Sequence, residues 1–385
     1  MKFEFTAPAR VIFGPGTLTQ AGALAVSLGR RALVVTGRHP ARAQRLLALL
    51  QEHGVATESF AVSGEPTTDV VALGAAAARR FRAELVVGFG GGSPLDAAKA
   101  IAAVAANGGE PLDYMEVVGR GQPIAKPSLP MLAIPTTAGT GSEVTRNAVL
   151  TSLTHGVKAS MRSVSMVPRV ALVDPELTHD LPPAVTASTG MDALTQLIEP
   201  LTCNKTNPLV DALCREGIGR VARSLHRAFA EGHHAAARED MALASLFGGF
   251  ALANAGLGAV HGFSGVIGGM YRAPHGAVCA ALLPHVMAAN HRALQARAPE
   301  SPLAARYDEV ARLLTGNPAA RAADGVAWVA QLAADLQIPP LATYGVQPDA
   351  IARIVEQAQK SSGMKANPIE MTTDELADIL RRALG

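Results

Sequence analysis

The sequence predicts a two-domain protein, with an N-terminal α/β domain built on a mostly parallel sheet and an all-α C-terminal domain. At roughly 150 residues per domain, the 385 residues of the chain suit two or three domains. Apolar residues make up 49% of the chain and charged residues 17%, which supports a large core and excludes global disorder. Short apolar runs alternate with helical patterns in the first half, and long Ala- and Leu-rich patterns fill the second. We place the domains at 1–178 and 179–385.

The first half contains four short apolar runs, each closed by Gly, Pro, Thr or Asp, which predict buried strands. The runs contain Val34-Val35, Val86-Val87 and Ile134, and the last ends at Asp174. Helical patterns lie between them, notably over residues 42–53 and 70–82. This alternation predicts a parallel sheet covered by helices on both faces. Residues 3–13 alternate apolar and polar side chains and predict an added hairpin or edge strand.

The second half predicts roughly seven to nine helices joined by short loops. Within it, residues 241–271 contain no Asp, Glu, Lys or Arg. That length permits a membrane span, but eight glycines, Asn254 and His261 make poor spanning material. We therefore expect a buried helix that runs into a glycine-rich turn.

The charge balance and the cysteines exclude several classes of function. Lys and Arg number 34 against 32 Asp and Glu, so a net charge of +2 gives no electrostatic reason to expect a nucleic-acid or membrane partner. The three cysteines form no CxxC pair and predict buried thiols in a reducing compartment. The N-terminus lacks the apolar stretch of a secretory signal, so a cytoplasmic protein is expected.

The segment LVVGFGGGSPLDAAK, residues 85–99, predicts a strand that runs through glycines into a helix. Glycines let backbone N–H groups approach an anion, and a helix N-terminus favours negative charge. We expect Ser93 to cap the helix, Pro94 to occupy its first position, and Asp96 to complete a capping box. The predicted ligand is a phosphate or pyrophosphate. The alternative is a tight turn without a ligand.

A second polar loop, PTTAGTGSEVT at residues 135–145, follows another predicted strand. It offers the hydroxyl groups of Thr136, Thr137, Thr140 and Ser142. In an open parallel sheet, ligands bind beyond the carboxyl ends of the strands, where both loops are expected. Ordinary turn chemistry is the alternative for this loop taken alone.

The helical half holds a set of side chains suited to a metal ion. Asp192 and Gln196 are four residues apart and share a helix face, and His261 and His275 lie in apolar, glycine-rich surroundings. A carboxylate with two imidazoles is a common ligand set for a divalent first-row metal. The alternative is a pair of hydrogen-bonded core histidines.

Five motifs together resemble the iron-containing (group III) alcohol dehydrogenases. They are GGGSPLDAAK, PTTAGTGSEVT, DPEL, MDALTQLIE and PHGAVCAALLP, in that order along nearly the whole chain. The resemblance implies a dinucleotide-binding α/β domain and a helical domain, similar to dehydroquinate synthase and glycerol dehydrogenase. It also implies a homodimer, and a cleft that holds nicotinamide and metal.

The resemblance also implies roles for individual residues. Gly91, Gly92 and Ser93 would cradle the coenzyme pyrophosphate, with Asp96 anchoring that loop. Lys158 matches the family lysine near the nicotinamide and its ribose, and is counted with the catalytic residues. The hydroxyl residues that would line the cofactor are Thr136, Thr137, Thr140 and Ser142. The residues that match three of the family's four metal ligands, and that would serve catalysis, are Asp192, His261 and His275.

Three positions depart from the family pattern. Gln196 stands where the family usually has a histidine ligand, and Gly265 where it often has a histidine thought to relay protons. An amide oxygen is a weaker donor than imidazole, so the metal, Fe²⁺ or Zn²⁺, is held by three strong ligands, is held loosely or is absent. Gly37 replaces the acidic residue that often bonds the adenosine ribose, and Arg38 follows it. Arg38 can pair with a 2′-phosphate, so we expect NADP to be accepted besides NAD; the alternative is that Arg38 faces solvent and NAD binds adequately.

The expected activity is hydride transfer between NAD(P) and an alcohol with its aldehyde or ketone, assisted by a metal. One alternative is a metal-independent reductase similar to the maleylacetate reductases, which Gln196 and Gly265 favour and the intact Asp192, His261 and His275 oppose. Others are a cyclase resembling dehydroquinate synthase and a nucleotide-binding protein without catalysis. The substrate itself is not identified by these patterns.

Overall fold

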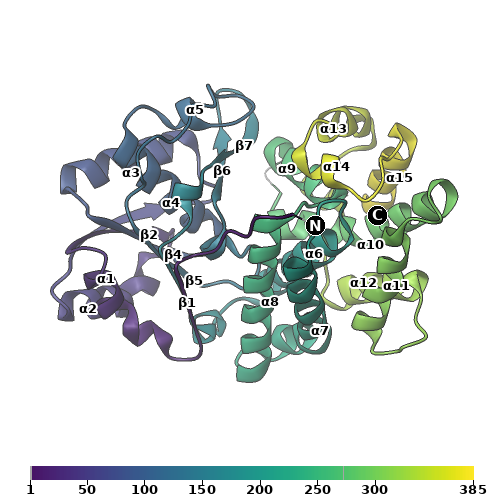
Figure 1. The fold of residues 1–385 in the computed structure, drawn as a ribbon, viewed down its shortest axis with the longest axis horizontal. Helices are drawn as coiled ribbons and strands as arrows, with labels where there is room; N and C mark the ends of the chain where they lie inside the picture. The colour runs from purple at the N-terminus through teal and green to yellow at the C-terminus, as the bar shows by residue number, and fades with distance from the viewer. Residues whose placement is uncertain (1, 272) are drawn as a thin grey trace. The chain divides into compact units, whose positions relative to one another are not determined.

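A computed structural model describes residues 2–271 and 273–385 (Figure 1). The chain divides into two compact units. The sheet unit contains Thr6–Thr137 and Gly141–Thr178, and the helical unit contains residues 2–5, Ala138–Thr140 and His179–Gly385. The short segment Ala138–Thr140 belongs by its contacts to the helical unit although its neighbours in sequence belong to the sheet unit.

The sheet unit is built on six strands in the order β1-β8-β5-β4-β2-β3, and all neighbouring strands pair in parallel. The strands are β1 Arg10–Phe13, β2 Arg31–Gly37, β3 Ala56–Val62, β4 Leu85–Gly90, β5 Met131–Pro135 and β8 Val170–Val173. The predicted parallel sheet is therefore confirmed. Its four predicted central strands are β2, β4, β5 and β8, and each is almost wholly buried.

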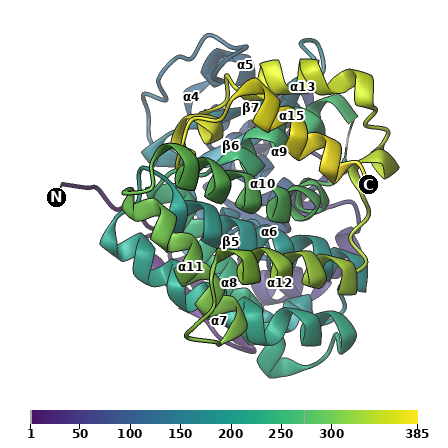
Figure 2. The same cartoon turned by 90° about the vertical axis from the view of Figure 1, so that its right-hand side faces the viewer.

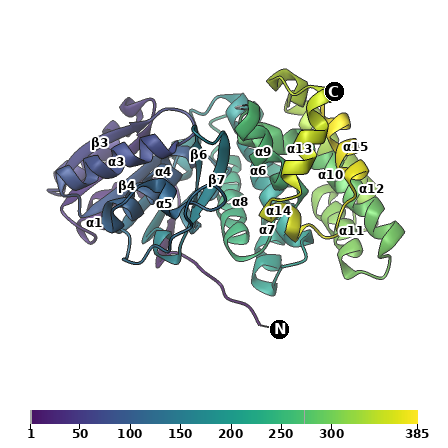
Figure 3. The same cartoon turned by 90° about the horizontal axis from the view of Figure 1, so that it is seen from above.

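Helices cover both faces of this sheet, as the alternation predicted (Figure 3). Strand β2 shows why: Leu33 and Val35 pack into one apolar cluster, and Val34 packs into the other. Successive side chains of a strand point to opposite faces, so an unbroken apolar run serves two cores. The cluster of Leu33 includes α3 and α4, and that of Val34 includes α1 and α2. These helices are α1 Ala21–Val26, α2 Gln44–Glu52, α3 Thr68–Phe81 and α4 Gly92–Asn107, with a short α5 Pro111–Tyr114 following.

Two parts of the sheet unit differ from expectation. A separate antiparallel hairpin, β6 Asn147–Ser152 and β7 Val157–Arg162, follows the second polar loop. Of the alternating segment at residues 3–13, only Arg10–Phe13 forms a strand, and it joins the sheet edge in parallel with β8. The edge strand is thus confirmed, and the hairpin alternative is wrong because β1 pairs with a distant strand.

The helical unit is all-α in its described residues (Figure 2). These residues form ten α-helices rather than seven to nine. The extra helices arise because the end of the chain breaks into short segments. The helices are α6 Pro183–Thr202, α7 Pro208–Ala230, α8 Ala235–Asn254, α9 Ala259–Tyr271, α10 His275–Arg297, α11 Pro302–Thr315, α12 Ala322–Asp335, α13 Ile351–Ala358, α14 Ser362–Ala366 and α15 Thr373–Ala383. Helix α6 lies against α7, α8 and α10, and it is buried along nearly all of its length from Gly190 onward.

The uncharged stretch at residues 241–271 forms the end of α8 and the whole of α9. The two helices meet at a bend of 95°. Neither of them is a candidate span by itself, and the same holds for every other helix among the residues the structure describes. The expected glycine-rich turn is the break at residues 255–258, and a second helix rather than a loop follows it.

Candidate functional site

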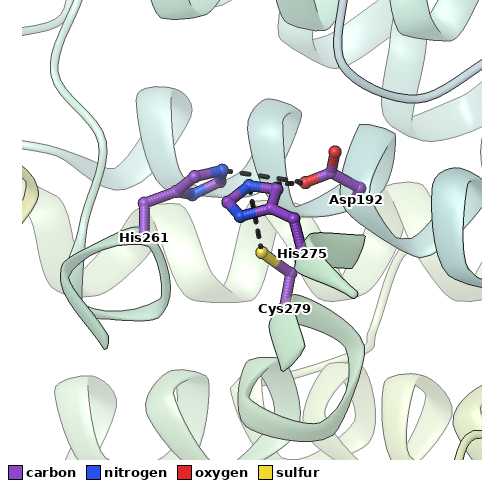
Figure 4. Close-up of side chains that lie close together, drawn as sticks. All are labelled: Asp192, His261, His275 and Cys279. Atoms are coloured by element: carbon purple, nitrogen blue, oxygen red, sulfur yellow. Dashed lines mark hydrogen bonds and ion pairs between the residues drawn. The ribbon is translucent and has the colours of Figure 1, made fainter. Parts of the chain in front are cut away.

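Four side chains of the types that can bind a metal ion meet in the helical unit (Figure 4). Asp192 comes from α6, His261 from α9, and His275 and Cys279 from α10. The Asp192 Oδ1 atom lies 3.8 Å from His261 Nε2 and 3.6 Å from His275 Nε2. The Cys279 Sγ atom lies 3.7 Å from His275 Nε2, and all four ligand atoms lie within 4.8 Å of one another. The structure thus brings together Asp192, His261 and His275, and it adds a thiol.

A close approach of α10 to α6 brings these side chains together. A Cβ atom on Gly276 would lie 2.4 Å from the Ser188 backbone oxygen and 3.3 Å from the Asp192 Cβ atom. Only glycine lets the start of α10 pack this tightly on α6. His275 is the first residue of α10, and Cys279, one turn later, shares its face.

Glu199, which lies two helical turns after Asp192 on the same face of α6, orients His261. Its Oε2 atom lies 2.6 Å from His261 Nδ1, and its Oε1 atom accepts the Val260 N–H at 2.7 Å. Burial alone lowers the pKa of His261, but the charge and hydrogen bond of Glu199 outweigh it and raise that pKa above its ordinary value. His261 Nε2 is buried and has no hydrogen-bond partner among the described residues. A carboxylate behind an imidazole is the usual way a protein aims the other nitrogen at a metal.

Gln196 lies one turn after Asp192 on α6 and is 1% exposed. Its Nε2 atom donates to the Gly139 backbone oxygen at 3.1 Å, from the segment that packs with the helical unit. Its Oε1 atom is buried and finds no hydrogen-bond partner within the described part of the chain. Buried polar atoms rarely lack partners in folded proteins. This amide oxygen and the buried His261 Nε2 atom, which lies 3.8 Å from Asp192 Oδ1, therefore each fit a divalent cation as the missing partner.

The glycine loop lies at the carboxyl end of β4, where α4 begins at Gly92. Gly90 has a φ of 153°, and a Cβ atom there would lie 2.7 Å from Pro94 Cγ. Gly91 is the N-cap and supplies no side-chain cap, so the predicted capping by Ser93 is wrong. Ser93 and Pro94 lie inside the first turn, where N–H groups lack helical partners and a proline is tolerated. The amides at this helix start are therefore left for a ligand.

Asp96 ties α4 to the second loop rather than capping the helix. Its Oδ1 atom accepts the Ser142 hydroxyl at 2.5 Å, and its Oδ2 atom accepts the Val149 N–H at 2.9 Å. Lys99, whose side chain is 0% exposed, lies 2.9 Å from Asp96 and donates to Thr145 Oγ1 at 2.7 Å. This buried pair holds the loop after β5 against α4, and the sequence analysis had not identified Lys99.

The remaining predicted coenzyme residues lie at several places. Thr136 N donates to the Gly90 oxygen at 2.9 Å, and a Cβ on Gly91 would lie 3.2 Å from Thr137 Oγ1, so the two loops are neighbours in the sheet unit. Thr140 belongs to the segment that packs with the helical unit.

Three further predicted residues lie outside these loops. Gly37 ends β2, and the exposed Arg38 donates from Nε to His39 Nε2 at 3.0 Å. Lys158, on β7, forms an ion pair of 2.9 Å with Glu65.

Buried Glu143 gives the sheet unit a testable pH dependence. It is 2% exposed beside Lys99, and burial raises its pKa from 4.5 to about 7. Between these values the folded chain keeps a proton that the unfolded chain has released, so this group's contribution to stability falls as pH rises. We expect Glu143→Gln to raise the melting temperature relative to wild type at pH 8 and to lose that advantage at pH 5. The difference corresponds to about 3 kcal/mol at most.

The control for this prediction is Glu176→Gln, which changes an exposed carboxylate of the same unit. Thermal unfolding of the three proteins across pH 5–8 makes the measurement. If Glu143→Gln followed the wild-type melting curve at every pH, the buried carboxyl would not carry the extra proton.

A parallel-sheet unit whose β4 strand runs through glycines into a helix, and a helical unit with a group of possible metal ligands, are features of a nucleotide-dependent oxidoreductase. The family model described as "Iron-containing alcohol dehydrogenase" matches residues 8–175, and the model of that family's C-terminal part matches residues 186–384. The chain belongs to the iron-containing alcohol dehydrogenase family, and it is an NAD(P)-dependent oxidoreductase acting on an alcohol and its carbonyl counterpart. The family uses NAD(H) and a divalent metal.

Individual relatives of this family match the chain over nearly its whole length. The chain is 35% identical over 394 residues to a 1,3-propanediol dehydrogenase of Klebsiella pneumoniae, covering 99% of this chain and 98% of that one. It is also 35% identical to alcohol dehydrogenase 4 of Schizosaccharomyces pombe, covering 99% and 89%. The crystal structure of a 1,3-propanediol oxidoreductase superposes with a TM-score of 0.92 at 35% identity, covering 100% of both chains. A sulfoacetaldehyde reductase of Bifidobacterium kashiwanohense, solved with NAD⁺, gives a TM-score of 0.88 at 29% identity, covering 100% of this chain and 99% of that one.

Proposed function

We propose that this chain exchanges a hydride between NAD(P) and a small alcohol or its aldehyde or ketone, with a divalent metal bound by Asp192, His261 and His275. The observation that carries the proposal is the His261 imidazole. Glu199 holds its Nδ1 atom, while its buried Nε2 atom lies 3.8 Å from Asp192 and has no hydrogen-bond partner among the described residues. A buried nitrogen arranged in this way is the ligand atom of a metal site.

Each residue has a defined task in this proposal. When bound, the metal would act as a Lewis acid that polarises the oxygen of the alcohol or carbonyl group. Asp192 supplies one negative charge next to the cation, and Glu199 fixes the ring of His261. Gln196 offers an amide oxygen whose direction is set by the bond from its nitrogen to Gly139.

The coenzyme half of the proposal rests on the start of α4. Gly91, Gly92 and Ser93 present amides to the pyrophosphate, and Asp96 keeps the Ser142 loop beside them. Thr136, Thr137, Thr140 and Ser142 are proposed to line the coenzyme, and Lys158 to contact its ribose.

Proton transfer is proposed to use water at Gly265. A Cβ atom on Gly265 would meet no described atom within 4 Å. The histidine that the family often carries there is therefore replaced by open space, in which water suits the role.

Removal of the metal tests the catalytic proposal. Protein purified without added metal is expected to hold about one divalent ion per chain, to lose activity on chelation, and to regain it with Zn²⁺ or Fe²⁺. Elemental analysis and alcohol-oxidation assays on the same samples make the measurement. Full activity in metal-free protein would instead support a reductase similar to the maleylacetate reductases, which the presence of Gln196 and Gly265 favours.

Acceptance of NADP is the second part of the proposal, and it rests on the end of β2. Position 37 is a glycine and offers no carboxylate, and the next residue is the exposed Arg38. We expect Arg38→Ala to raise the KM for NADP roughly tenfold, about 1.4 kcal/mol, with little effect on NAD. Gly37→Asp is expected to shift the preference toward NAD. Arg42→Ala, another exposed arginine of the same unit, is the control. Equal effects of Arg38→Ala on both coenzymes would contradict this assignment.

A homodimer and a cytoplasmic location complete the proposal. The three cysteines are buried free thiols in the structure, which supports a reducing compartment. Sedimentation of the purified chain tests the dimer.

A further inference from the structure

The side chain that the metal proposal leaves without a task is Cys279. It is fully buried, and its Sγ atom lies 3.7 Å from His275 Nε2 (Figure 4). With Asp192, His261 and His275 it forms one group of ligand atoms, all within 4.8 Å of one another. The thiol therefore faces the polar centre of the helical unit rather than apolar side chains alone.

The spacing of these atoms suits ligands of a single ion, whose coordination can expand to a fifth position for the substrate oxygen. With metal–ligand bonds of about 2.0–2.3 Å and tetrahedral angles, neighbouring ligand atoms are about 3.3–3.8 Å apart. The three measured separations are 3.6 Å, 3.7 Å and 3.8 Å. Small movements of the side chains would bring the four atoms to ligand spacing.

We propose that Cys279 is a metal ligand in this chain, completing an Asp192–His261–His275–Cys279 set in place of the imidazole that Gln196 replaces. The inference rests on the proposed metal site and adds its fourth ligand. The position of Cys279 on α10 explains how it can take the place of the missing histidine ligand. Cys279 follows His275 by one turn, and Gly276 lets that turn pack closely against Asp192.

The charges and softness of the donors support the thiol over the amide. A thiolate and a carboxylate together neutralise a divalent cation, whereas Asp192 with the neutral Gln196 leaves one charge uncompensated in a buried site. A bound cation deprotonates a coordinating thiol, so the proposed ligand is the thiolate. Soft thiolate ligands favour Zn²⁺ among the available ions. The site is therefore expected to select zinc.

Cobalt substitution tests the ligand directly. The full-length protein loaded with Co²⁺ is expected to show a thiolate-to-cobalt charge-transfer band in the near ultraviolet. Cys279→Ala abolishes that band, while Gln196→Ala and Cys214→Ala keep it. Cys214 is the matched control because it is a fully buried cysteine on α7 in the same unit and outside the four-residue group. Zinc affinity should fall at least tenfold in Cys279→Ala and less in Gln196→Ala.

X-ray absorption of the wild-type zinc protein provides a readout that needs no variant. Sulfur scattering at about 2.3 Å from zinc is the expected result. Metal bound with only nitrogen and oxygen neighbours would overturn the role of Cys279 while leaving the proposed function intact. A wild-type protein that binds neither zinc nor cobalt would overturn both.

Discussion

Asp192→Ala is expected to lower kcat/KM for alcohol oxidation about a thousandfold or more, a loss of roughly 4 kcal/mol of transition-state stabilisation. The Asp192 Oδ1 atom is the common neighbour of both imidazole nitrogens, at 3.6 Å and 3.8 Å. Without this carboxylate, two imidazoles and a thiol remain, and the site loses one of the two negative charges that would offset a divalent cation. Metal content measured on the same samples should fall with activity.

The control for Asp192 is Asp180→Ala, because the side chain of Asp180 is 84% exposed in the same unit. Its variant is expected to keep both metal and activity. Circular dichroism and thermal unfolding establish that Asp192→Ala remains folded. Unchanged turnover in a folded Asp192→Ala protein would show that the reaction does not need the Asp192 carboxylate.

The core strands of the sheet could be predicted because β2, β4, β5 and β8 are apolar runs buried on both faces. Strand β3, ATESFAV, could not, since it is an edge strand with mostly exposed or half-buried side chains. The β6–β7 hairpin also escaped prediction. Its strands, NAVLTS and VKASMR, are short and mix apolar with polar residues, and that weak signal resembles a loop. The division into α/β and all-α parts followed from long-range composition, which local ambiguity does not disturb.

The centre was only partly visible in the sequence. Asp192, Gln196 and Glu199 follow an i, i+4, i+7 spacing that places all three on one helix face, so Glu199 could have been found. Cys279 was counted as one of three buried thiols, because burial alone does not separate a core cysteine from a ligand. Its proximity to His261 and Asp192 depends on how α9, α10 and α6 pack, which no local pattern encodes.

The start of α4 shows how an offset of two residues changes an interpretation. Ser93 and Asp96 have the spacing of a capping box, yet the helix begins at Gly92 with Gly91 as its cap. Asp96 instead accepts hydrogen bonds from the Ser142 hydroxyl and the Val149 N–H, and it forms an ion pair with Lys99. Tertiary partners outcompete the local hydrogen bond, and the helix start is left open for an anion.

That open helix start makes Ser93→Asp the second change with a large expected effect. A carboxylate in the first turn of α4 occupies the place proposed for the pyrophosphate and repels it. Two like charges about 4 Å apart at the protein surface repel by about 4 kcal/mol. We expect the dissociation constant of NAD(P)H to rise roughly a hundredfold or more, an effect of about 3 kcal/mol. Fluorescence titration of the bound nicotinamide measures it.

The same Ser93→Asp change is expected to increase the stability of the folded protein while it weakens coenzyme binding. A negative charge in the first turn of a helix stabilises it by about 0.3–1 kcal/mol, so the coenzyme-free Ser93→Asp protein should melt slightly higher than wild type. Ser93→Asn has nearly the same shape without the charge and should bind the coenzyme within a few-fold of wild type. Because a misfolded variant would lose stability and affinity together, only a charge at the coenzyme phosphate site produces opposite signs. Equal coenzyme affinity in Ser93→Asp and Ser93→Asn would place the pyrophosphate somewhere other than the α4 helix start.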